Sequence, residues 1–253
     1  MKSVNRDELA QFLAKELQVT CFRDYCPNGV QVEGRNTIKH IVSGVTASLA
    51  LLEKAVEMQA DAILVHHGYF WRGEDMRVIG QKQRRLKLLL ENDISLFAYH
   101  LPLDNHAELG NNIGLARQLG LSADGRFGEN DLGWLGKVVD ETVATLADLA
   151  LHIELKLGRK PLLIGDPAAP VGRVAWCTGA AQNMLDQAIA AGASVYLSGE
   201  ISEPTVHLAR ESGVAYIACG HHATERFGVQ SLGAFIADRF GVQHSFVDID
   251  NPV

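Results

Sequence analysis

The sequence predicts an α/β protein built from two similar three-layer α/β domains that are related by an internal duplication. Short β-rich apolar runs alternate with segments of helical periodicity, which is typical of a partly parallel sheet covered by helices. Residues 41–67 also align without gaps with residues 174–200. In this alignment Leu52 falls on Leu185 and small residues meet at the strand-to-helix turn. The alternative explanation is that any two β-α-β units look alike.

The local spacing of apolar residues predicts the individual elements. Leu9, Leu13 and Leu17 recur at helical spacing, and Ser48 is a plausible N-cap of the next helix. The run 61–67 is continuous and apolar, as strands buried on both faces are. In chain order we expect a helix within 3–17, a strand at 38–47, a helix at 48–60, a strand at 61–67, a helix near 78–92, a strand at 94–100, a helix near 108–119, a strand at 214–220 and a helix after His221.

A Gly-rich stretch at 120–133 is the expected boundary between the two domains. We therefore expect a first α/β half at 1–125 and a second at 126–253, packed together as one compact unit.

The composition excludes several classes of protein. With 47% hydrophobic and 21% charged residues, the 253-residue chain has an ordinary globular composition. No run reaches the roughly 18 apolar residues of a membrane span, and we find no signal peptide. Four cysteines without a Cys-x-x-Cys pair are too few for a disulfide framework, so we expect a reducing cytoplasm. The net charge of −7 and the lack of a basic face make nucleic acid an improbable partner, and no membrane partner is expected.

Polar residues follow the expected strands at their carboxyl ends, where open α/β sheets bind ligands. They are His66, His67, His100 and Asp104 in the first half, and Glu200, His221, His222 and Glu225 in the second. Neighbouring side chains of a strand point to opposite faces, so we expect the adjacent pair His66 and His67 to lie in a loop beyond the strand. His221 and Glu225 stand at i and i+4, which places them on one face of a helix.

These residue types favour a metal site. Imidazoles combined with carboxylates suit zinc, iron or manganese. Three histidines and two carboxylates are more than one tetrahedral ion needs, but they would serve two ions about 3.5–4 Å apart with a bridging carboxylate. Glu225 is the expected bridge and Asp104 a terminal ligand. Each piece also has an ordinary structural explanation: a polar loop for the histidines, an Asx turn for Asp104 and a solvated helix face for His221.

The motifs "LVHHG", "YHLPLDNHAELGNN", "YLSGEISEPTVH" and "GHHATERFG" resemble the GTP cyclohydrolase 1 type 2 family, the NGG-interacting-factor-three-like dinuclear metal proteins, in its short bacterial form. The resemblance implies two α/β domains that face each other across a dinuclear metal site, assembled into a toroidal homohexamer. The implied ligands are His66, His67, Asp104, His221 and Glu225. The family also implies that His67 and Asp104 hold one ion, that His66 and His221 hold the other, and that Glu225 bridges them.

A metal-dependent hydrolase acting on a nucleotide or a similar small molecule is the function we expect. Two ions lower the pKa of a bound water towards ~7, which would allow attack on C8 of a purine and eventual release of formate. His100 or His222 would shuttle protons, and Glu200 and His207 would orient the ligands from behind. Two alternatives are a metal-binding or metal-delivery protein without turnover, and an interaction module whose metals brace the cleft between the domains.

Overall fold

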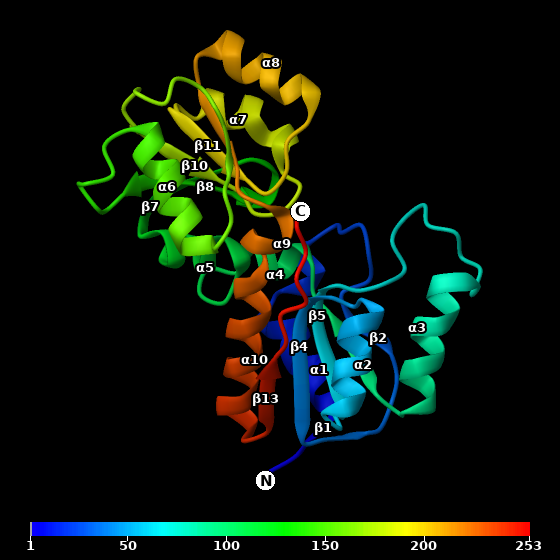
Figure 1. The fold of residues 1–253 in the computed structure, drawn as a ribbon. Helices are drawn as coiled ribbons and strands as arrows, with labels where there is room; N and C mark the ends of the chain where they lie inside the picture. Colours follow the sequence, from blue (N-terminus) through cyan, green and yellow to red (C-terminus); the bar gives the residue numbers. More distant parts are fainter. Residues whose placement is uncertain (1) are drawn as a thin grey trace. The chain divides into compact units, whose positions relative to one another are not determined.

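The computed structural model describes residues 2–253, which fold into two compact units (Figure 1). Unit 1 comprises the chain up to Gly110 together with Gly228–Asp250, and unit 2 comprises Asn111–Phe227 with Asn251–Val253. The boundary that we expected near residue 125 is therefore wrong. The chain enters unit 2 earlier, and it returns to unit 1 through α10 (Arg226–Phe240) and β13 (Gln243–Phe246).

Unit 1 contains a five-stranded sheet in the order β13-β4-β5-β6-β2. The strands β4 (His40–Thr46), β5 (Ala62–His67) and β6 (Ser95–Ala98) run parallel, with β13 parallel to β4 at one edge and β2 (Gly29–Val32) antiparallel to β6 at the other. The remaining elements are β1 (Val4–Asn5), α1 (Arg6–Glu16), the 3-10 turn Val19–Cys21, β3 (Thr37–Ile38), α2 (Leu49–Glu57), α3 (Gly80–Glu91) and α4 (Leu101–Asn105).

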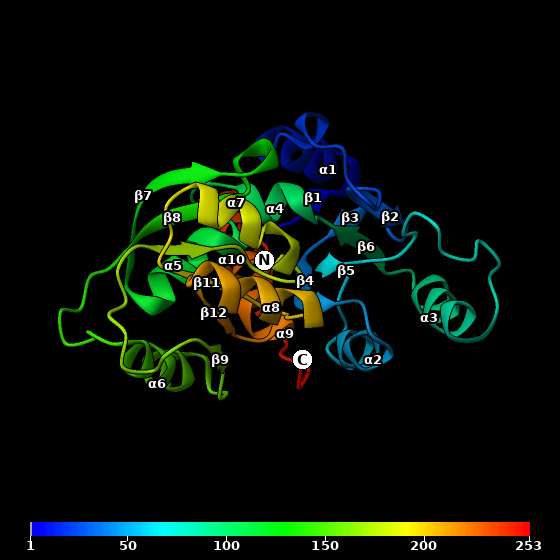
Figure 2. The ribbon, with the colours of Figure 1, turned by 90° about the horizontal axis from the view of Figure 1, so that it is seen from above.

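Helices cover both faces of this sheet. Successive strand residues point to opposite faces, and neighbouring residues of β5 therefore pack in different clusters. Leu64 belongs to a buried cluster with Leu13 of α1 and Leu232 of α10. Its neighbour Ile63 belongs to a different cluster, with Leu52 of α2. Figure 2 shows α1 and α2 on opposite sides of the strands. Ser48 caps α2 through its hydroxyl, as the sequence predicts.

Unit 2 contains a six-stranded sheet in the order β7-β8-β10-β11-β12-β9. Here β10 (Val174–Trp176), β11 (Val195–Ser198) and β12 (Ala215–Ala218) run parallel, flanked by antiparallel β8 (Gly133–Val138) and β9 (Leu162–Ile164). The remaining elements are α5 (Asn111–Leu119), β7 (Leu121–Phe127), the 3-10 turns Glu129–Asp131 and Gln182–Met184, α6 (Leu146–Leu157), α7 (Leu185–Ala190), α8 (Glu203–Ser212) and α9 (His221–Thr224).

The second sheet is also covered on both faces. Leu197 packs in a cluster with Leu115 of α5 and Ile153 of α6. Tyr196, the preceding residue, packs in a cluster with Ala188 of α7 and with residues of α8. Figure 1 shows α7 and α8 on one side of β10 and β11, and α5 and α6 on the other. The predicted α/β class with three layers in each half is thus confirmed, whereas descent from a duplication stays a prediction.

The two sheets share a core arrangement. Each has three parallel strands followed by an antiparallel edge strand, β4-β5-β6-β2 in unit 1 and β10-β11-β12-β9 in unit 2. This matches the alignment of 41–67 with 174–200, which places β5 over β11. Within residues 2–253, no helix combines the length and the apolar character needed to cross a membrane.

Candidate metal-binding residues of the two units

The two adjacent histidines of unit 1 lie inside β5 rather than beyond it, so the expected loop placement is wrong. Their rings nevertheless lie side by side, with centroids 4.6 Å apart. Strand geometry fixes only the direction of each Cα–Cβ bond, and the rings extend further. The buried His66 is held through Nδ1 by the carbonyl of Tyr99 (2.9 Å), and His67 through Nδ1 by the hydroxyl of Thr46 (3.1 Å).

Asp104 lies beside this pair. It belongs to the short helix α4, which begins after His100 with Pro102 in its first turn. Its carboxylate is buried, and Oδ1 lies 3.4 Å from Nε2 of His66. Within unit 1 Asp104 thus contacts His66, whereas the resemblance implies that it shares an ion with His67.

His100 follows β6 and also faces the histidine pair. Its ring centroid lies 5.0 Å from that of His66 and 5.8 Å from that of His67. The other side of the ring is held by Asp24, whose Oδ1 is 2.7 Å from Nδ1 of His100. Burial raises the pKa of the Asp24 carboxyl, but hydrogen bonds and the neighbouring imidazole outweigh burial and lower it to about 2. Sequence reasoning missed Asp24, which lies in a loop with no recognisable motif.

In unit 2, His221 lies between two carboxylates. Its Nε2 is 3.0 Å from Oε2 of Glu225, and its Nδ1 is 2.7 Å from Oε1 of Glu200. Burial lowers the pKa of the imidazole, but the two carboxylates raise it to about 9. Glu225 is buried and is the residue between the end of α9 and the start of α10, so one continuous helix does not run through it. It nevertheless makes the expected contact with His221. The role expected for Glu200, to orient a metal ligand, stays a prediction, and its contact with His221 is the observation that bears on it.

Space for the Glu225 carboxylate depends on a glycine. Gly179 has φ +69°, and a Cβ at this position would collide with Oε1 of Glu225. The carbonyl of Gly179 accepts the N–H of Gly199 (2.8 Å), and the N–H of Gly179 donates to the hydroxyl of Thr224 (3.1 Å). The loops after β10, β11 and β12 are thus fastened to one another around Glu225 and His221.

The two remaining predicted residues lie differently. His222 is half-buried in α9, and its backbone N–H donates to the carbonyl of Val253 (3.0 Å). His207 lies on the outer face of α8 with a side chain that is 60% exposed, and it contacts Glu203 one turn earlier. The expectation that His207 orients a ligand is therefore wrong, because the period of α8 turns this side chain to solvent.

Both units offer donors that suit a divalent cation. Buried imidazole nitrogens and carboxylate oxygens are typical ligands of zinc, iron and manganese. One ring nitrogen each of His66, His67 and His100 lies within 4.8 Å of the others. Asp24, Cys26 and His100 also lie close together, and burial and the charge of Asp24 raise the pKa of the Cys26 thiol to about 12.

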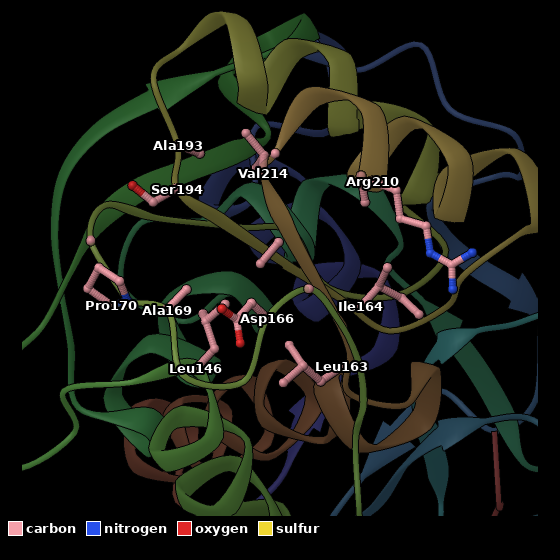
Figure 3. A pocket seen from close by; sticks show the side chains of 15 residues that line it. Leu146, Leu163, Ile164, Asp166, Ala169, Pro170, Ala193, Ser194, Arg210 and Val214 are labelled. Carbon is pink, nitrogen blue, oxygen red and sulfur yellow. The ribbon is translucent and has the colours of Figure 1, made fainter.

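Unit 2 also contains a cavity of about 820 Å³ (Figure 3). Ser194 and Val214 line it and directly precede β11 and β12, so it lies at the amino ends of these strands. Glu200 and His221 follow the carboxyl ends of the same strands. The cavity is therefore separate from the polar cluster of unit 2.

Comparison with known proteins identifies the family. The model described as Duf34/NIF3 (NGG1p interacting factor 3) matches residues 4–252. The chain belongs to the Duf34/NIF3 family. A protein of Pseudomonas aeruginosa named GTP cyclohydrolase 1 type 2 homolog is 56% identical over 239 residues, covering 93% of this chain and 94% of its own. The protein of the same name from Escherichia coli is 48% identical, covering 97% of this chain and 98% of its own. The predicted resemblance is confirmed.

Three solved structures share the fold. Protein ybgI, described as of unknown function, superposes with a TM-score of 0.93 at 45% identity, over 99% of this chain and 100% of its own. TTHA1606 from Thermus thermophilus gives 0.84 at 32% identity, with coverage of 99% and 100%. Reduced HcgD from Methanocaldococcus jannaschii gives 0.82 at 22% identity, with coverage of 98% and 99%, which shows the fold alone.

Proposed function

We propose that this protein is a dinuclear metal-dependent hydrolase that acts on a nucleotide or a related small molecule, in a GTP cyclohydrolase-like reaction. One observation carries the proposal. In each unit a buried carboxylate lies beside an imidazole, Asp104 at 3.4 Å from His66 and Glu225 at 3.0 Å from His221. Ionised carboxylates are rarely buried unless a cation or several donors compensate them. The names of the relatives, GTP cyclohydrolase 1 type 2 homolog, support the same class of reaction.

The proposed ligands of two divalent ions are His66, His67, Asp104, His221 and Glu225. Zinc, iron or manganese would suit this set of nitrogen and oxygen donors. Glu225 would bridge the ions, with His67 and Asp104 on one and His66 and His221 on the other. In support, other groups contact three of the imidazoles through Nδ1, an arrangement typical of metal-ligating histidines.

The residues of the chain would then have different roles in the reaction. When bound, the two ions supply a water whose pKa is near ~7 and which can act as nucleophile at neutral pH. His100 or His222 would carry protons to and from the purine as C8 is attacked, the imidazole ring opens and formate leaves. Glu200 would keep the ring of His221 in place during this sequence, through its 2.7 Å contact.

The first test is metal content. Elemental analysis of protein purified without added metal should give about two ions per chain, and Glu225→Ala should lower this number sharply. Glu203→Ala is the matched control, because Glu203 is an exposed acid on α8 that contacts the exposed side chain of His207. Wild-type protein that stays empty after reconstitution with zinc, iron and manganese would contradict the proposal and favour a non-catalytic interaction protein.

A second test separates catalysis from metal binding alone. Nucleotides are screened for metal-dependent hydrolysis, and the active one is then tested with His100→Asn. A catalyst should lose turnover by about 10²-fold or more while keeping its fold and its metal. A metal-binding or metal-delivery protein, the alternative function, would have no turnover to lose at any stage of the screen.

The proposal includes assembly into a toroidal homohexamer, which follows from the family. Exposed apolar side chains, among them Leu151 and Leu155 on α6 and Met76 in the loop before α3, support contacts with other copies. Light scattering should give six times the mass of the chain, and a monomeric mass would refute this part.

A further inference from the structure

Asp24 is an unusually well-anchored carboxylate in unit 1. Its side chain is only 3% exposed. Oδ1 accepts the N–H of Tyr25 (2.6 Å) and lies 2.7 Å from Nδ1 of His100, while Oδ2 accepts the N–H of Leu101 (3.0 Å) and the amide of Asn28 (2.8 Å). The side-chain oxygen Oδ1 of Asn28 in turn accepts the backbone N–H of His100 (2.7 Å). Backbone and side chain of His100 are therefore fixed by the same loop.

This arrangement determines which nitrogen of His100 carries the proton. An ionised carboxylate can only accept hydrogen bonds. The pKa of Asp24 is about 2, so the group is ionised at neutral pH. Nδ1 of His100 must therefore be the donor in the 2.7 Å contact. In the neutral ring, Nε2 then carries the lone pair and can accept a hydrogen bond.

The ring of His100 also lies beside the histidine pair. The centroids of His66 and His67 lie 5.0 and 5.8 Å from that of His100, and ring nitrogens of all three approach within 4.8 Å. Trp71 closes one flank, with its ring at 86° to that of His100 and 5.0 Å away. A polar molecule held by His66 and His67 would consequently meet an acceptor nitrogen of His100 in a fixed direction.

We propose that Asp24 is a positioning residue, which holds His100 in the Nδ1–H tautomer so that Nε2 accepts a hydrogen bond from the molecule bound beside His66 and His67. The reactive role of this acceptor rests on the proposed function, where the molecule would be the attacking water. Accepting one O–H of that water would turn an oxygen lone pair towards the substrate. The tautomer itself is independent of any reaction.

The test is nuclear magnetic resonance of the full chain labelled with ¹⁵N in the histidine rings, with His100→Asn used to assign the signal. At a pH where the ring is neutral, wild-type His100 should show a protonated Nδ1 and an unprotonated Nε2. In Asp24→Asn the ring should switch to the Nε2–H tautomer where the NH₂ faces Nδ1 of His100, and should keep Nδ1–H where the NH₂ faces Leu101 and Asn28. Asp24→Ala has no side-chain acceptor, so its ring should switch to, or exchange with, the Nε2–H tautomer. Wild-type protein with a protonated Nε2, or a pattern unchanged in both variants, would overturn the proposal.

The matched control is Asp61→Asn. Asp61 is a similarly buried carboxylate of unit 1 that accepts the N–H groups of Lys39 and His40 and contacts Arg35. Its substitution should leave the His100 tautomer unchanged, whereas a change equal to that of Asp24→Asn would show a merely structural effect. If turnover is found, Asp24→Asn should lower kcat by about 10–100-fold with KM and metal content little changed. Absence of turnover in the wild type would refute the proposed function while the tautomer remains measurable.

Discussion

Replacing Asp24 with Asn should remove a defined, pH-dependent part of the free energy of unfolding. Burial raises the pKa of the carboxyl, but the hydrogen bonds from His100, Asn28 and Tyr25 and the charge of the His100 ring outweigh it and lower the pKa from its ordinary 3.8 to about 2 in the folded protein. At about 1.4 kcal/mol per pKa unit, the ionised group stabilises the fold by about 2 kcal/mol at neutral pH. A lowered pKa gives stability that is present above ~4 and is lost as the pH falls through ~2.

The measurement compares wild type with Asp24→Asn by urea unfolding of chelator-treated protein, from about pH 7 to about pH 3. Asn does not titrate, so the change with pH in the difference between the two proteins belongs to Asp24, whatever strain the amide adds. About half of the ~2 kcal/mol should have disappeared by pH 3. A stability difference that stays constant across this range would refute the reasoning, since Asp24 would then titrate alike in the folded and unfolded chain.

Two further substitutions test unit 2. Gly179→Ala should destabilise the protein by about 1–3 kcal/mol more than Gly192→Ala does. Both glycines have positive φ, but only at position 179 would the added Cβ collide with Glu225. Equal melting temperatures for the two variants would contradict this. Glu200→Gln should lower the pKa of His221 from about 9 towards its ordinary 6.5, since one of two carboxylates that raise it is lost. The stabilisation from protonated His221 is present below pH ~6.5 and is lost as the pH rises through ~9. Titration of the histidines by nuclear magnetic resonance, on metal-free protein, should give a lower pKa for His221 in Glu200→Gln than in the wild type, and an equal pKa would contradict this.

Local patterns predicted the central elements of both sheets because burial on two faces leaves a strong signal in sequence. Strand β5 is a continuous apolar run, and the helix after Ser48 has both a cap and a periodic face. The edge strands carry little of this signal. Strand β7, for example, is largely exposed or half-buried, and its residues fall in the stretch that we interpreted as a domain boundary. Its place is set by pairing with β8, which local composition does not reveal.

The division of the chain into units depends on contacts between distant residues. Strand β13 pairs with β4 in the register Gln243 with His40 and Phe246 with Ser43. About 200 positions separate these partners, so no periodicity within a window of the chain reports their pairing. The same limit applies to Asp24, whose partner His100 lies 76 positions away. By contrast, the candidate ligands could be found from sequence, because His66 and His67 end a buried strand and the other three lie in the segments that follow one.

Comparison of the two units shows why the missed carboxylate matters. A histidine follows the third parallel strand of each core, His100 after β6 and His221 after β12. In both cases a carboxylate lies 2.7 Å from Nδ1 and fixes the ring. The carboxylates come from different places: Glu200 stands where the alignment puts His67, so unit 1 has an imidazole at that position and takes its carboxylate from the loop of Asp24 instead. The two units thus hold an imidazole through Nδ1 in the same way, although the two carboxylates come from non-equivalent positions of the alignment.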